Sequence, residues 1–360
     1  MQSNDLKPVR VAHILNTGGY SGAENVVITM IRSMRPQVQG IYVSPAGMIG
    51  GILQEEDIEH YKVPKLGVGT LRHAIREIKP DLIHAHDFTA TVTAAFAGTG
   101  LPVISHLHNN SPWLQQRGVR SRIFFQAAKR TSKILTVSDA VMHEYVYSGR
   151  LQYKTEVVGN PIDFYRIDLL AGGASENVAH FDLAFFGRES APKNPLFFLK
   201  IVQELAKNNP TIRAIMIGDG ELHGEVAAYI QKYKLEQNVI EVGFQRNPYV
   251  YIKQADILCM PSLWEGFGLT AIEAMHFGLP VVCSGAGGLS NIVDESCGAV
   301  CNQDVRKYVN EIEELMGNRE YYHRKSLGAL KQAERYNNLN QYMGHMGEIY
   351  RNVLEKANRA

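Results

Sequence analysis

Short apolar runs alternate with stretches of helical periodicity throughout the chain, and this alternation limits the folds it can adopt more than any other feature. In the first half the expected strands are residues 9–15, 40–43, 81–85, 103–107, 134–137 and 156–158, and the expected helices are residues 23–34, 70–78, 88–98, 120–130 and 139–147. In the second half the expected strands are 183–186, 213–217, 239–242, 257–260 and 280–283, and the helices are 195–207, 221–233, 248–254 and 269–277. Strands separated by helices of this length form βαβ units, so each half is expected to be an α/β, Rossmann-like domain with a parallel sheet.

The alternation is interrupted near the middle of the chain. Residues 160–179 contain Pro161, Gly172 and Gly173 and lack sustained periodicity, which is typical of a linker. Because 360 residues exceed what one core usually holds, we expect two domains, facing each other across a cleft. Beyond residue 304 the chain is expected to be helical. The expected boundaries are 1–165 for the first domain, 166–180 for the linker, 181–338 for the second domain, and 339–360 for a helix that packs back on the first domain.

Composition narrows the class of protein. The apolar fraction of 45% and the charged fraction of 20% are typical of a globular protein in water. A net charge of +1 argues against nucleic acid as the main partner. Residues 1–8 are polar, unlike a signal peptide, and no apolar run approaches the ~18 residues of a membrane span, so a cytoplasmic location is expected. The four cysteines lack zinc-site spacing and are expected to be reduced, buried thiols.

The most informative local motif is Pro-Ser-Leu-Trp-Glu-Gly-Phe-Gly-Leu-Thr-Ala-Ile-Glu at residues 261–273. It follows an apolar strand, contains a Gly-x-Gly turn and leads into a helix. Such a turn directs unpaired backbone N–H groups and the positive end of a helix dipole at one spot, which suits a phosphate. Gly266 and Gly268 let a ligand approach the backbone. Glu265 lies on the turn and Glu273 about one turn into the helix, within reach of a sugar or ribose hydroxyl, so the motif suggests a nucleotide sugar.

Two cations lie in the loop after the first strand of the second half. Arg188 and Lys193 are five residues apart in Gly-Arg-Glu-Ser-Ala-Pro-Lys-Asn, and they are expected to converge on one anion. Two other glycine-containing stretches are expected at the same edge of the sheet. Residues 218–220 favour a plain turn, whereas residues 285–288 suit either a strand-to-helix loop or a ligand contact.

A glycine-rich loop, Asn-Thr-Gly-Gly-Tyr-Ser-Gly at residues 16–22, follows the first strand of the chain. It is either a tight turn or a loop that contacts phosphate or substrate. Its glycines lack the Gly-x-Gly-x-x-Gly spacing, and residues 37–44 contain no acidic residue to hold a ribose. A nicotinamide-dependent dehydrogenase is therefore disfavoured. Glu24 is expected to accept N–H groups in the first turn of the following helix.

Four histidines lie near the ends of two neighbouring expected strands. His84 and His86 form one pair, His106 and His108 the other, and alternation puts the members of each pair on one face. This spacing invites a metal site, but Asp87 is the only carboxylate nearby in the sequence, so packed or hydrogen-bonded core histidines are the favoured interpretation. His108, which precedes two asparagines, is the best candidate to touch a substrate.

Residues 117–133 carry six cations and no acid, with apolar residues among them. The cations are Arg117, Arg120, Arg122, Lys129, Arg130 and Lys133. Such a segment suits an anionic membrane surface or an anionic acceptor. A solvated helix face carries the same pattern, so both interpretations stay open.

Together these segments resemble the family 4 glycosyltransferases of the GT-B fold, over nearly the whole chain. The matching pieces are Gly-Gly-Tyr-Ser-Gly-Ala-Glu at 18–24, His108, Val-Val-Gly-Asn-Pro-Ile-Asp at 157–163, Gly187-Arg-x4-Lys193, Gly-Asp-Gly at 218–220, and Glu265-x7-Glu273 with Gly-Leu-Pro-Val-Val after it. The chain departs from the family pattern at Asn291, where members often carry Glu, and at Asn160-Pro161, where Asn-Gly is usual. The resemblance implies a GT-B fold with an acceptor-side first domain and a second domain that binds the nucleotide-sugar donor.

The resemblance also implies roles for residues of the second domain. Arg188 and Lys193 would bind the donor diphosphate. Glu273 would hold the ribose hydroxyls, and Glu265 would contact the donor sugar. Backbone contacts to sugar and phosphate would come from Gly266, Phe267, Gly268 and Leu269.

In the first domain, Gly18 and Gly19 would approach the distal phosphate and the sugar, and His108 would touch a sugar hydroxyl. His108 thus joins Arg188, Lys193 and Glu265 in the expected catalytic set. Further candidates for contact with the acceptor are Asn16, Asn109 and Asn160.

The activity that the resemblance implies is retaining transfer of a sugar from a nucleoside-diphosphate sugar, with UDP favoured, to a hydroxyl acceptor. Such enzymes make bacterial polysaccharides, glycolipids and other glycoconjugates, with no cofactor beyond the donor and no bound metal. Many relatives use lipid-diphosphate-linked acceptors, which favours peripheral contact with the cytoplasmic membrane. Two alternatives are a nucleotide-sugar epimerase or hydrolase, which needs no acceptor, and a non-catalytic nucleotide-sugar-binding subunit. The retained Arg188, Lys193, Glu265 and Glu273 argue against the second alternative.

Overall fold

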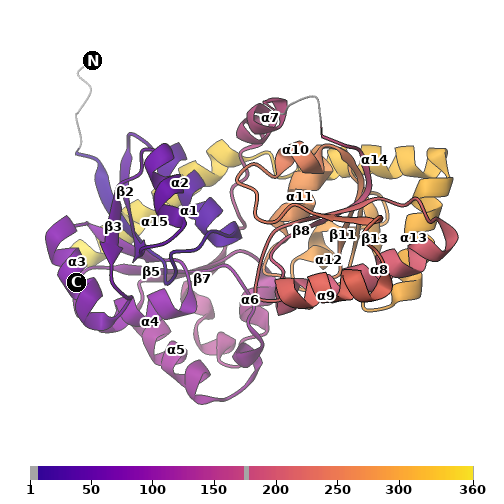
Figure 1. The fold of residues 1–360 in the computed structure, drawn as a ribbon. Coiled ribbons are helices and arrows are strands. Elements are labelled where there is room, and N and C mark those ends of the chain that lie inside the picture. The colour runs from indigo at the N-terminus through magenta and orange to yellow at the C-terminus, as the bar shows by residue number, and fades with distance from the viewer. Residues whose placement is uncertain (1–6, 174–177, 360) are drawn as a thin grey trace. The chain divides into compact units, whose positions relative to one another are not determined.

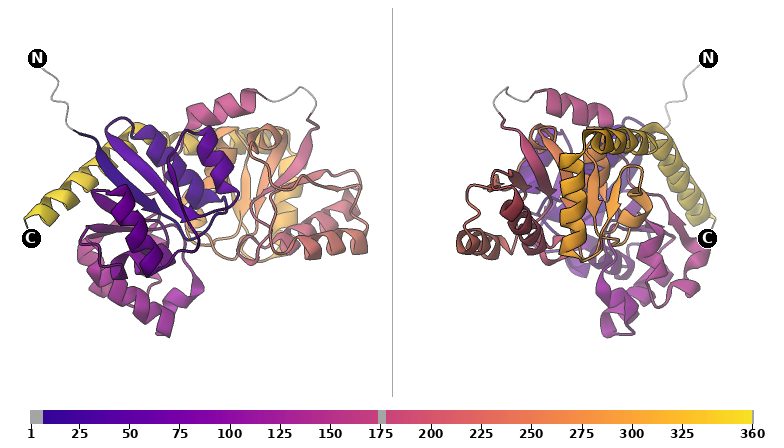
Figure 2. Two further views of the ribbon diagram at one scale, coloured as in Figure 1. Left: turned by 60° about the vertical axis from the view of Figure 1, so that its left-hand side comes forward. Right: turned by 90° about the vertical axis from the view of Figure 1, so that its right-hand side faces the viewer.

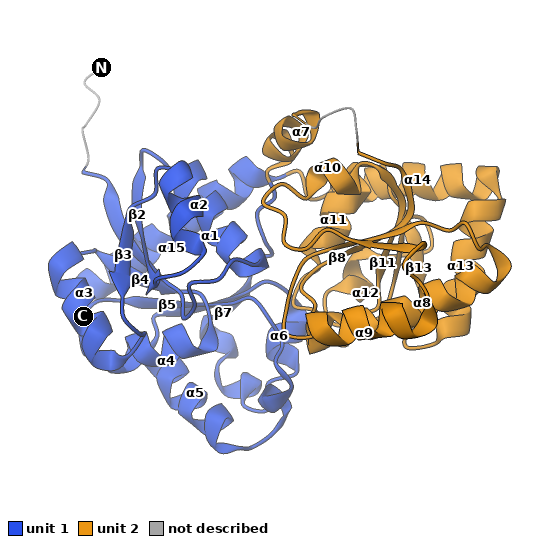
Figure 3. Cartoon of the chain, viewed as in Figure 1, with its two compact units in different colours: residues 1–162, 338–360 blue, residues 163–337 orange. Residues whose placement is uncertain are grey.

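The computed structural model describes residues 7–173 and 178–359, which form two compact units (Figure 3). Unit 1 comprises Met1–Ile162 and Asn338–Ala360, and unit 2 comprises Asp163–Asn337. The C-terminal segment therefore groups with the first part of the chain. Each unit has its own parallel sheet and its own hydrophobic core.

Unit 1 is built on a seven-stranded parallel sheet with the order β3-β2-β1-β4-β5-β6-β7 (Figure 1). Its strands are β1 Val9–Ile14, β2 Val38–Pro45, β3 His60–Val63, β4 Leu82–Ala85, β5 Val103–Leu107, β6 Lys133–Thr136 and β7 Thr155–Val157. In the register, Val11 of β1 pairs with Gly40 of β2 on one side and with Leu82 of β4 on the other. The strand order reverses between β1 and β4, and sheets of this topology bind ligands outside the carboxyl ends of the strands at the reversal.

Helices cover both faces of this sheet (Figures 1 and 2). They are α1 Gly22–Ser33, α2 Ile49–Glu55, α3 Val68–Ile78, α4 Phe88–Phe96, α5 Val119–Arg130, α6 Asp139–His143 and α15 Leu339–Asn358. Helices α3 and α4 pack on a core that includes Ile14 and Ile83. Side chains alternate along a strand, so His84 points to the opposite face. There the C-terminal helix α15 contacts it, with Tyr350 Oη 2.8 Å from His84 Nδ1.

Unit 2 repeats the topology with six parallel strands in the order β10-β9-β8-β11-β12-β13. Its strands are β8 Phe181–Phe186, β9 Ala214–Ile217, β10 Val239–Glu241, β11 Ala255–Met260, β12 Val281–Cys283 and β13 Gly298–Val300. Its helices are α7 Phe164–Gly172, α8 Pro195–Asn208, α9 His223–Tyr233, α10 Tyr249–Ile252, α11 Leu269–His276, α12 Leu289–Ile292, α13 Val305–Gly317 and α14 Arg319–Glu334. Helices α8, α9 and α13 share one buried core with the sheet through residues such as Phe198, Val226 and Ile312. Here the reversal of strand order lies between β8 and β11.

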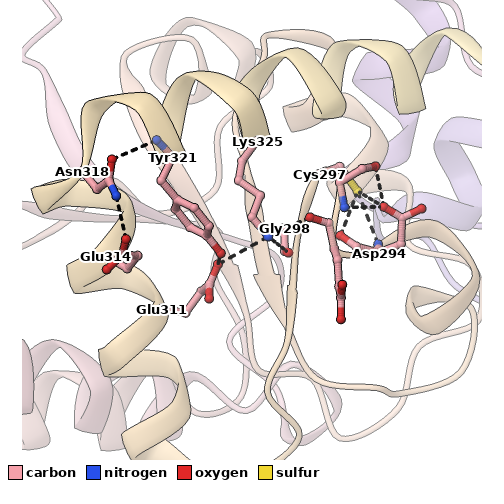
Figure 4. A network of polar contacts seen from close by, with 10 residues as sticks. Asp294, Cys297, Gly298, Glu311, Glu314, Asn318, Tyr321 and Lys325 are labelled. Carbon is pink, nitrogen blue, oxygen red and sulfur yellow. Dashed lines mark hydrogen bonds and ion pairs between the residues drawn. The ribbon is translucent and has the colours of Figure 1, made fainter.

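Hydrogen bonds from a buried lysine connect α14 to the start of β13 and the loop before it (Figure 4). Lys325 is 5% exposed, and its Nζ donates to the carbonyl oxygens of Glu295 at 2.8 Å and Gly298 at 2.9 Å. The carboxylate of Glu311 on α13 lies 3.8 Å from the same nitrogen. A buried ammonium is tolerated only when its hydrogen bonds are satisfied, so these acceptors hold α13, α14 and the end of the sheet together.

Two expectations about the elements were wrong. The first part of the stretch expected to be a linker, 166–180, belongs to helix α7. The side chain of Asp163 caps this helix by accepting from Arg166 N at 3.0 Å, and Phe164 and Ile167 are buried. Residues 174–177 of that stretch lie outside the described residues. The elements α2, β3, α12 and β13 were not expected, because β3 and β13 contain no sustained apolar run and the two helices span only a turn or two.

Two other expectations can be compared with the described residues. All four cysteines are unpaired and buried, as expected. No helix in the described ranges is both long enough and apolar enough to cross a membrane.

Candidate active site

Two loops meet at the reversal of strand order in unit 2 (Figure 1). Residues 187–194 follow β8 and residues 261–268 follow β11, the two strands that flank the reversal. Leu263 N donates to Pro192 O at 2.7 Å, and Lys193 Nζ forms an ion pair with Glu265 Oε2. The loops are therefore tied together where sheets of this topology bind ligands.

The turn into α11 depends on glycine at two positions. Gly268 has φ +112°, in the left-handed region, and a Cβ there would lie 2.9 Å from Leu289 Cδ2. A Cβ on Gly288 would lie 2.3 Å from Phe267 O, so the glycine turn at 285–288 packs against the back of this loop. No side chain caps α11 at Gly268. The first N–H groups of α11 thus start the helix without a side-chain acceptor, as in anion sites at helix N-termini.

Glu273 is the buried acid of the site. It is 5% exposed, and Tyr249 Oη donates to its Oε1 at 3.2 Å. Burial raises the pKa of Glu273 to about 7, against smaller opposing effects of the Tyr249 hydrogen bond and the Lys193 charge. A carboxylate has about four acceptor positions, so Tyr249 leaves capacity for the hydroxyls of a ligand. Sequence reasoning missed Tyr249, which no spacing rule connects to Glu273.

The raised pKa of Glu273 makes the stability of the protein depend on pH. Between the ordinary value of 4.5 and about 7, the folded state keeps a proton that the unfolded state has lost, so stability is expected to fall as pH rises through this range. In the wild-type protein this loss should reach up to about 3 kcal/mol in the free energy of unfolding, and in Glu273→Gln it should be absent. Urea unfolding of both proteins at several pH values measures the difference. A difference that is constant with pH would contradict the assigned burial.

The two cations expected to act together have different partners in the structure. Arg188 Nη2 lies 3.4 Å from Glu221 Oε2, and both side chains are more than half exposed. Lys193 and its partner Glu265 are mostly buried. An exposed ion pair contributes little, so Arg188 can reorient toward a ligand at small cost. Convergence of both cations on one anion stays a prediction.

The Gly-Asp-Gly stretch supports the loop that carries Arg188. Gly218 has φ +140°, and a Cβ there would lie 2.0 Å from Gly187 O. A Cβ on Gly220 would lie 2.3 Å from Glu189 O. Glu189 N also donates to Asp219 O at 3.2 Å. Close backbone packing therefore explains both glycines, in line with the plain turn expected from the sequence.

Replacing Gly218 by alanine is expected to displace the loop that carries Arg188 and to destabilise unit 2 by several kcal/mol, because both the backbone angle and the space exclude a Cβ. Gly224 offers a matched control, since it lies within α9 and a Cβ there would meet nothing within 4 Å. Gly224→Ala should instead stabilise the protein by about 0.5–1 kcal/mol. Thermal or urea unfolding distinguishes the two variants, and equal effects would contradict the packing described.

In unit 1 a hydrogen bond joins the loop at 16–22, which follows β1, to the segment after β4, at the reversal of strand order. Asn16 N donates to Asp87 Oδ2 at 3.0 Å, and Asp87 caps α4 through Ala90 N. A Cβ on Gly18 would lie 2.3 Å from Ala46 O, so packing against the turn after β2 accounts for this glycine. At Gly19 the nearest such atom is the Thr17 hydroxyl, 3.6 Å away, which leaves room for a ligand.

The hydrogen-bond donors predicted for Glu24 were wrong. Its carboxylate accepts hydrogen bonds from the hydroxyls of Thr17 and Ser21, and no hydrogen bond from a backbone N–H to it is found among the described residues. Ser21 stands at the N-cap position of α1, in extended conformation, and the carboxylate reaches back to it. Glu24 therefore fixes the shape of the loop that contains Gly18 and Gly19.

The four histidines expected at the strand ends form one largely buried cluster, which also contains His13. Register explains this addition, because His13 on β1 pairs with His84 on β4, and sequence reasoning missed it. His13 Nδ1 lies 2.9 Å from His86 Nε2, and His86 Nδ1 lies 3.1 Å from His108 Nε2. Burial lowers the pKa of His13 to about 3 and that of His108 to about 4, so the rings are neutral at pH 7. The hydrogen bonds of His13, His86 and His108 agree with the interpretation that the sequence favoured, whereas His106 has no hydrogen-bond partner among the described residues.

The asparagines proposed for the acceptor occupy different surroundings. Asn160 is buried, and its side chain partly offsets the lowering of the His108 pKa by burial. Asn109 is exposed, and its Oδ1 accepts from Ser111 Oγ at 3.1 Å. Asn16 lies on the loop after β1. The structure therefore brings His108 and Asn160 together and leaves Asn109 at the surface.

The cationic segment around α5 is smaller than the sequence suggested. Lys133 lies on β6, and its Nζ is 2.6 Å from Glu156 Oε2. The guanidinium of Arg130 lies 4.3 Å from the centroid of the Phe96 ring. Exposed cations remain at 117, 120, 122, 129 and 130. Beside them, Val119 is 73% exposed and Ile123 46% exposed.

Two family models match the chain, one on each half. The model described as Glycosyltransferase Family 4 matches residues 20–166, and the model described as Glycosyl transferases group 1 matches residues 175–332. The chain therefore belongs to the family 4 glycosyltransferases.

Individual relatives agree with this assignment. An uncharacterized glycosyltransferase of Methanocaldococcus jannaschii is 28% identical over 58% of this chain and 56% of its own length. The Escherichia coli UDP-Gal:alpha-D-GlcNAc-diphosphoundecaprenol alpha-1,3-galactosyltransferase is 23% identical over 62% of each chain. The alignments thus span less than two thirds of either relative. The crystal structure of Anabaena HepE with UDP and glucose superposes with a TM-score of 0.82 at 22% identity, over 95% of this chain and 99% of that one, which confirms the GT-B fold.

Proposed function

We propose that this protein is a retaining glycosyltransferase that moves a sugar from a nucleoside-diphosphate sugar, preferably a UDP-sugar, to a hydroxyl group of an acceptor. The observation that carries the proposal is the junction of two loops in unit 2, where Lys193, Glu265, the start of α11 and the buried Glu273 gather at the reversal of strand order. A cation and helix N–H groups suit a diphosphate, and carboxylates suit the hydroxyls of ribose and sugar.

The reaction breaks the bond between sugar C1 and the phosphate oxygen, and the bonding electrons stay on the departing diphosphate. Lys193, Arg188 and the first N–H groups of α11 would stabilise this growing negative charge. Because these groups supply the positive charge, the transfer itself would need neither a cofactor nor a metal ion. The acceptor's oxygen would bond to C1 on the face that the diphosphate leaves, which retains the configuration at C1. Its proton would pass to the departing phosphate oxygen, so no side-chain base is required.

The remaining residues would bind the donor and the acceptor. Glu273 would hold the ribose hydroxyls, Glu265 would contact the donor sugar, and the backbone of residues 266–269 would contact sugar and phosphate. In unit 1, His108 would contact a sugar hydroxyl, and the loop at 16–22 would approach the ligand at its open glycine.

The relatives support the choice of donor and acceptor. The E. coli relative takes UDP-galactose and an acceptor on diphosphoundecaprenol, by its name, and the HepE structure holds UDP and glucose. We therefore favour a UDP-sugar donor and an acceptor linked to a lipid diphosphate. Such a reaction belongs to the synthesis of a polysaccharide, glycolipid or other glycoconjugate at the cytoplasmic face of a membrane.

A product assay tests this function. The purified protein is incubated with UDP-sugars, with and without a polyprenyl-diphosphate-linked sugar. UDP release together with an elongated lipid is expected only when both substrates are present, and NMR should show the anomeric configuration of the donor in the product. An epimerised or hydrolysed sugar without acceptor would favour the alternative enzyme classes, and an inverted linkage would exclude the retaining mechanism.

Contact with an anionic membrane would run through α5. The double variant Val119→Ser/Ile123→Ser should lower the fraction of protein that co-sediments with anionic vesicles severalfold, because it removes the exposed apolar side chains beside Arg120 and Arg122. Lys133→Ser is the matched control, since Glu156 already neutralises this lysine. Failure of the wild-type protein to bind vesicles at low salt would rule out the contact.

A further inference from the structure

The histidine cluster of unit 1 contains ring nitrogens that its hydrogen bonds do not account for. The hydrogen bonds run from His13 through His86 to His108 and leave out His106. His106 is 0% exposed, and neither of its ring nitrogens has a hydrogen-bond partner among the described residues. A buried polar atom without a partner is costly, and an ion or a water is the usual explanation. The orphaned imidazole thus points to a ligand inside the cluster.

Three of the histidines have the spacing of metal ligands. His86, His106 and His108 each offer one ring nitrogen, and these atoms all lie within 4.8 Å of one another. Zn–N bonds of about 2.0–2.1 Å in a tetrahedral site place the ligand nitrogens roughly 3.3 Å apart. His86 Nδ1 and His108 Nε2 are already 3.1 Å apart. The ring centroids of His106 and His108 are 4.3 Å apart, so the third imidazole lies directly beside this pair.

The protonation of these rings suits a metal. A neutral imidazole has one lone pair to offer a metal, on the ring nitrogen that carries no proton. When His86 Nε2–H donates to His13 Nδ1, the lone pair of His86 lies on Nδ1, facing His108. His13 is thus an outer partner of His86, of the kind that commonly orients metal-bound imidazoles.

A second group of three, His13, His84 and His86, is less suited to take up an ion. All three rings are fully buried, and His84 Nδ1 is engaged by Tyr350 Oη at 2.8 Å. His108 is partly exposed, so the first group has a route by which an ion can enter.

We propose that His86, His106 and His108 form a binding site for a divalent transition metal such as Zn²⁺, and that the bound metal inhibits sugar transfer by occupying His108. Imidazole is a preferred ligand of Zn²⁺, Ni²⁺ and Co²⁺, and three ligands leave a fourth position open to water. The inhibition rests on the proposed function, since it requires that His108 contacts a substrate, whereas the binding does not. The proposed metal is held by residues of unit 1 alone, and none of the charge stabilisation proposed for unit 2 is assigned to it.

Titration of the chelator-treated protein with Co²⁺ tests the site without any sugar substrate. One equivalent should produce the visible absorption of a tetrahedral Co²⁺ centre, and Zn²⁺ should abolish it. His106→Asn should lower the affinity for the metal by at least about a hundredfold, because loss of an outer hydrogen-bond partner of a ligand already lowers metal affinity about 10–100-fold. His73→Asn removes an exposed histidine and is the matched control. No absorption with the wild-type protein, or equal binding by His106→Asn, would overturn the proposal.

Two further measurements keep the proposal testable if His106→Asn folds poorly. X-ray absorption of the Zn²⁺-loaded wild-type protein should show three imidazole nitrogens at about 2.0–2.1 Å, and a shell with fewer imidazoles would contradict the site. In the transfer assay, Zn²⁺ should inhibit the wild-type protein reversibly, with recovery on adding chelator. His106→Asn should keep its basal activity and lose this inhibition. If the protein binds the metal but shows no transfer activity, the metal site is confirmed and the proposed function is contradicted.

Discussion

Replacing Lys193 by alanine is expected to lower the turnover of sugar transfer at least about a hundredfold, because a preorganised donor to a leaving group is typically worth 10²–10³ in rate. Lys193 is mostly buried between the two loops at the reversal of strand order, where its charge is poorly screened by water. Arg188→Ala should lower turnover by at least about the same factor. Initial rates at saturating donor and acceptor measure the effect. Near-normal turnover of either purified variant would refute the assignment of that cation to the diphosphate.

A matched control and a double-mutant cycle separate catalysis from local structure. Lys207 forms an exposed ion pair with Glu204 on α8, at 2.7 Å, and Lys207→Ala should leave turnover unchanged. Lys193 also neutralises Glu265, so Lys193→Ala leaves that carboxylate without its partner. The pair Lys193→Ala and Glu265→Ala should therefore be non-additive, whereas two independent roles would give additive losses.

Replacing Glu273 by alanine is expected to weaken binding of the nucleoside diphosphate about tenfold to a hundredfold, more than it lowers the rate at saturation. The carboxylate is buried beside the diphosphate site, and hydrogen bonds to a charged group contribute about 1.5–3 kcal/mol. The ribose would be held equally in the ground state and in the transition state. Loss of its contact with Glu273 should therefore affect binding rather than the chemical step. Calorimetric titration with UDP alone measures the affinity.

The conservative variant sharpens this test. Glu273→Gln keeps the shape of the side chain and one acceptor oxygen, so it should lose less affinity than the alanine variant. Tyr249→Phe removes the hydroxyl that donates to Glu273 at 3.2 Å and should change the affinity only slightly, since it leaves the carboxylate in place. Unchanged UDP affinity in Glu273→Ala would exclude this residue from the ribose site.

The sheet architecture was predictable because buried parallel strands and their crossover helices leave strong periodic patterns. The central strands β8 and β11 and the helix α11 begin and end within a few residues of the expected positions. The edge strands β3 and β13 were missed because each contains a single β-branched apolar residue, Val63 and Val300, so neither has the apolar run that identified the equally short edge strands β7 and β10. Helix α7 was missed because the cap at Asp163, not a long apolar repeat, defines it.

The site was predictable where the chemistry lies within one loop and not where it joins distant segments. The turn that leads through Gly268 into α11 follows directly from local sequence. The contacts of Glu273 with Tyr249 and of Arg188 with Glu221 depend on register and loop packing, which spacing does not encode. The histidine cluster likewise required the pairing of His13 with His84 across β1 and β4.

A crystal structure of the protein with UDP tests the central claim most directly. The diphosphate should lie at the start of α11, within hydrogen-bond distance of Lys193 Nζ, with the ribose hydroxyls on Glu273. UDP bound elsewhere, or an empty position between the loops after β8 and β11 at saturating UDP, would contradict the account.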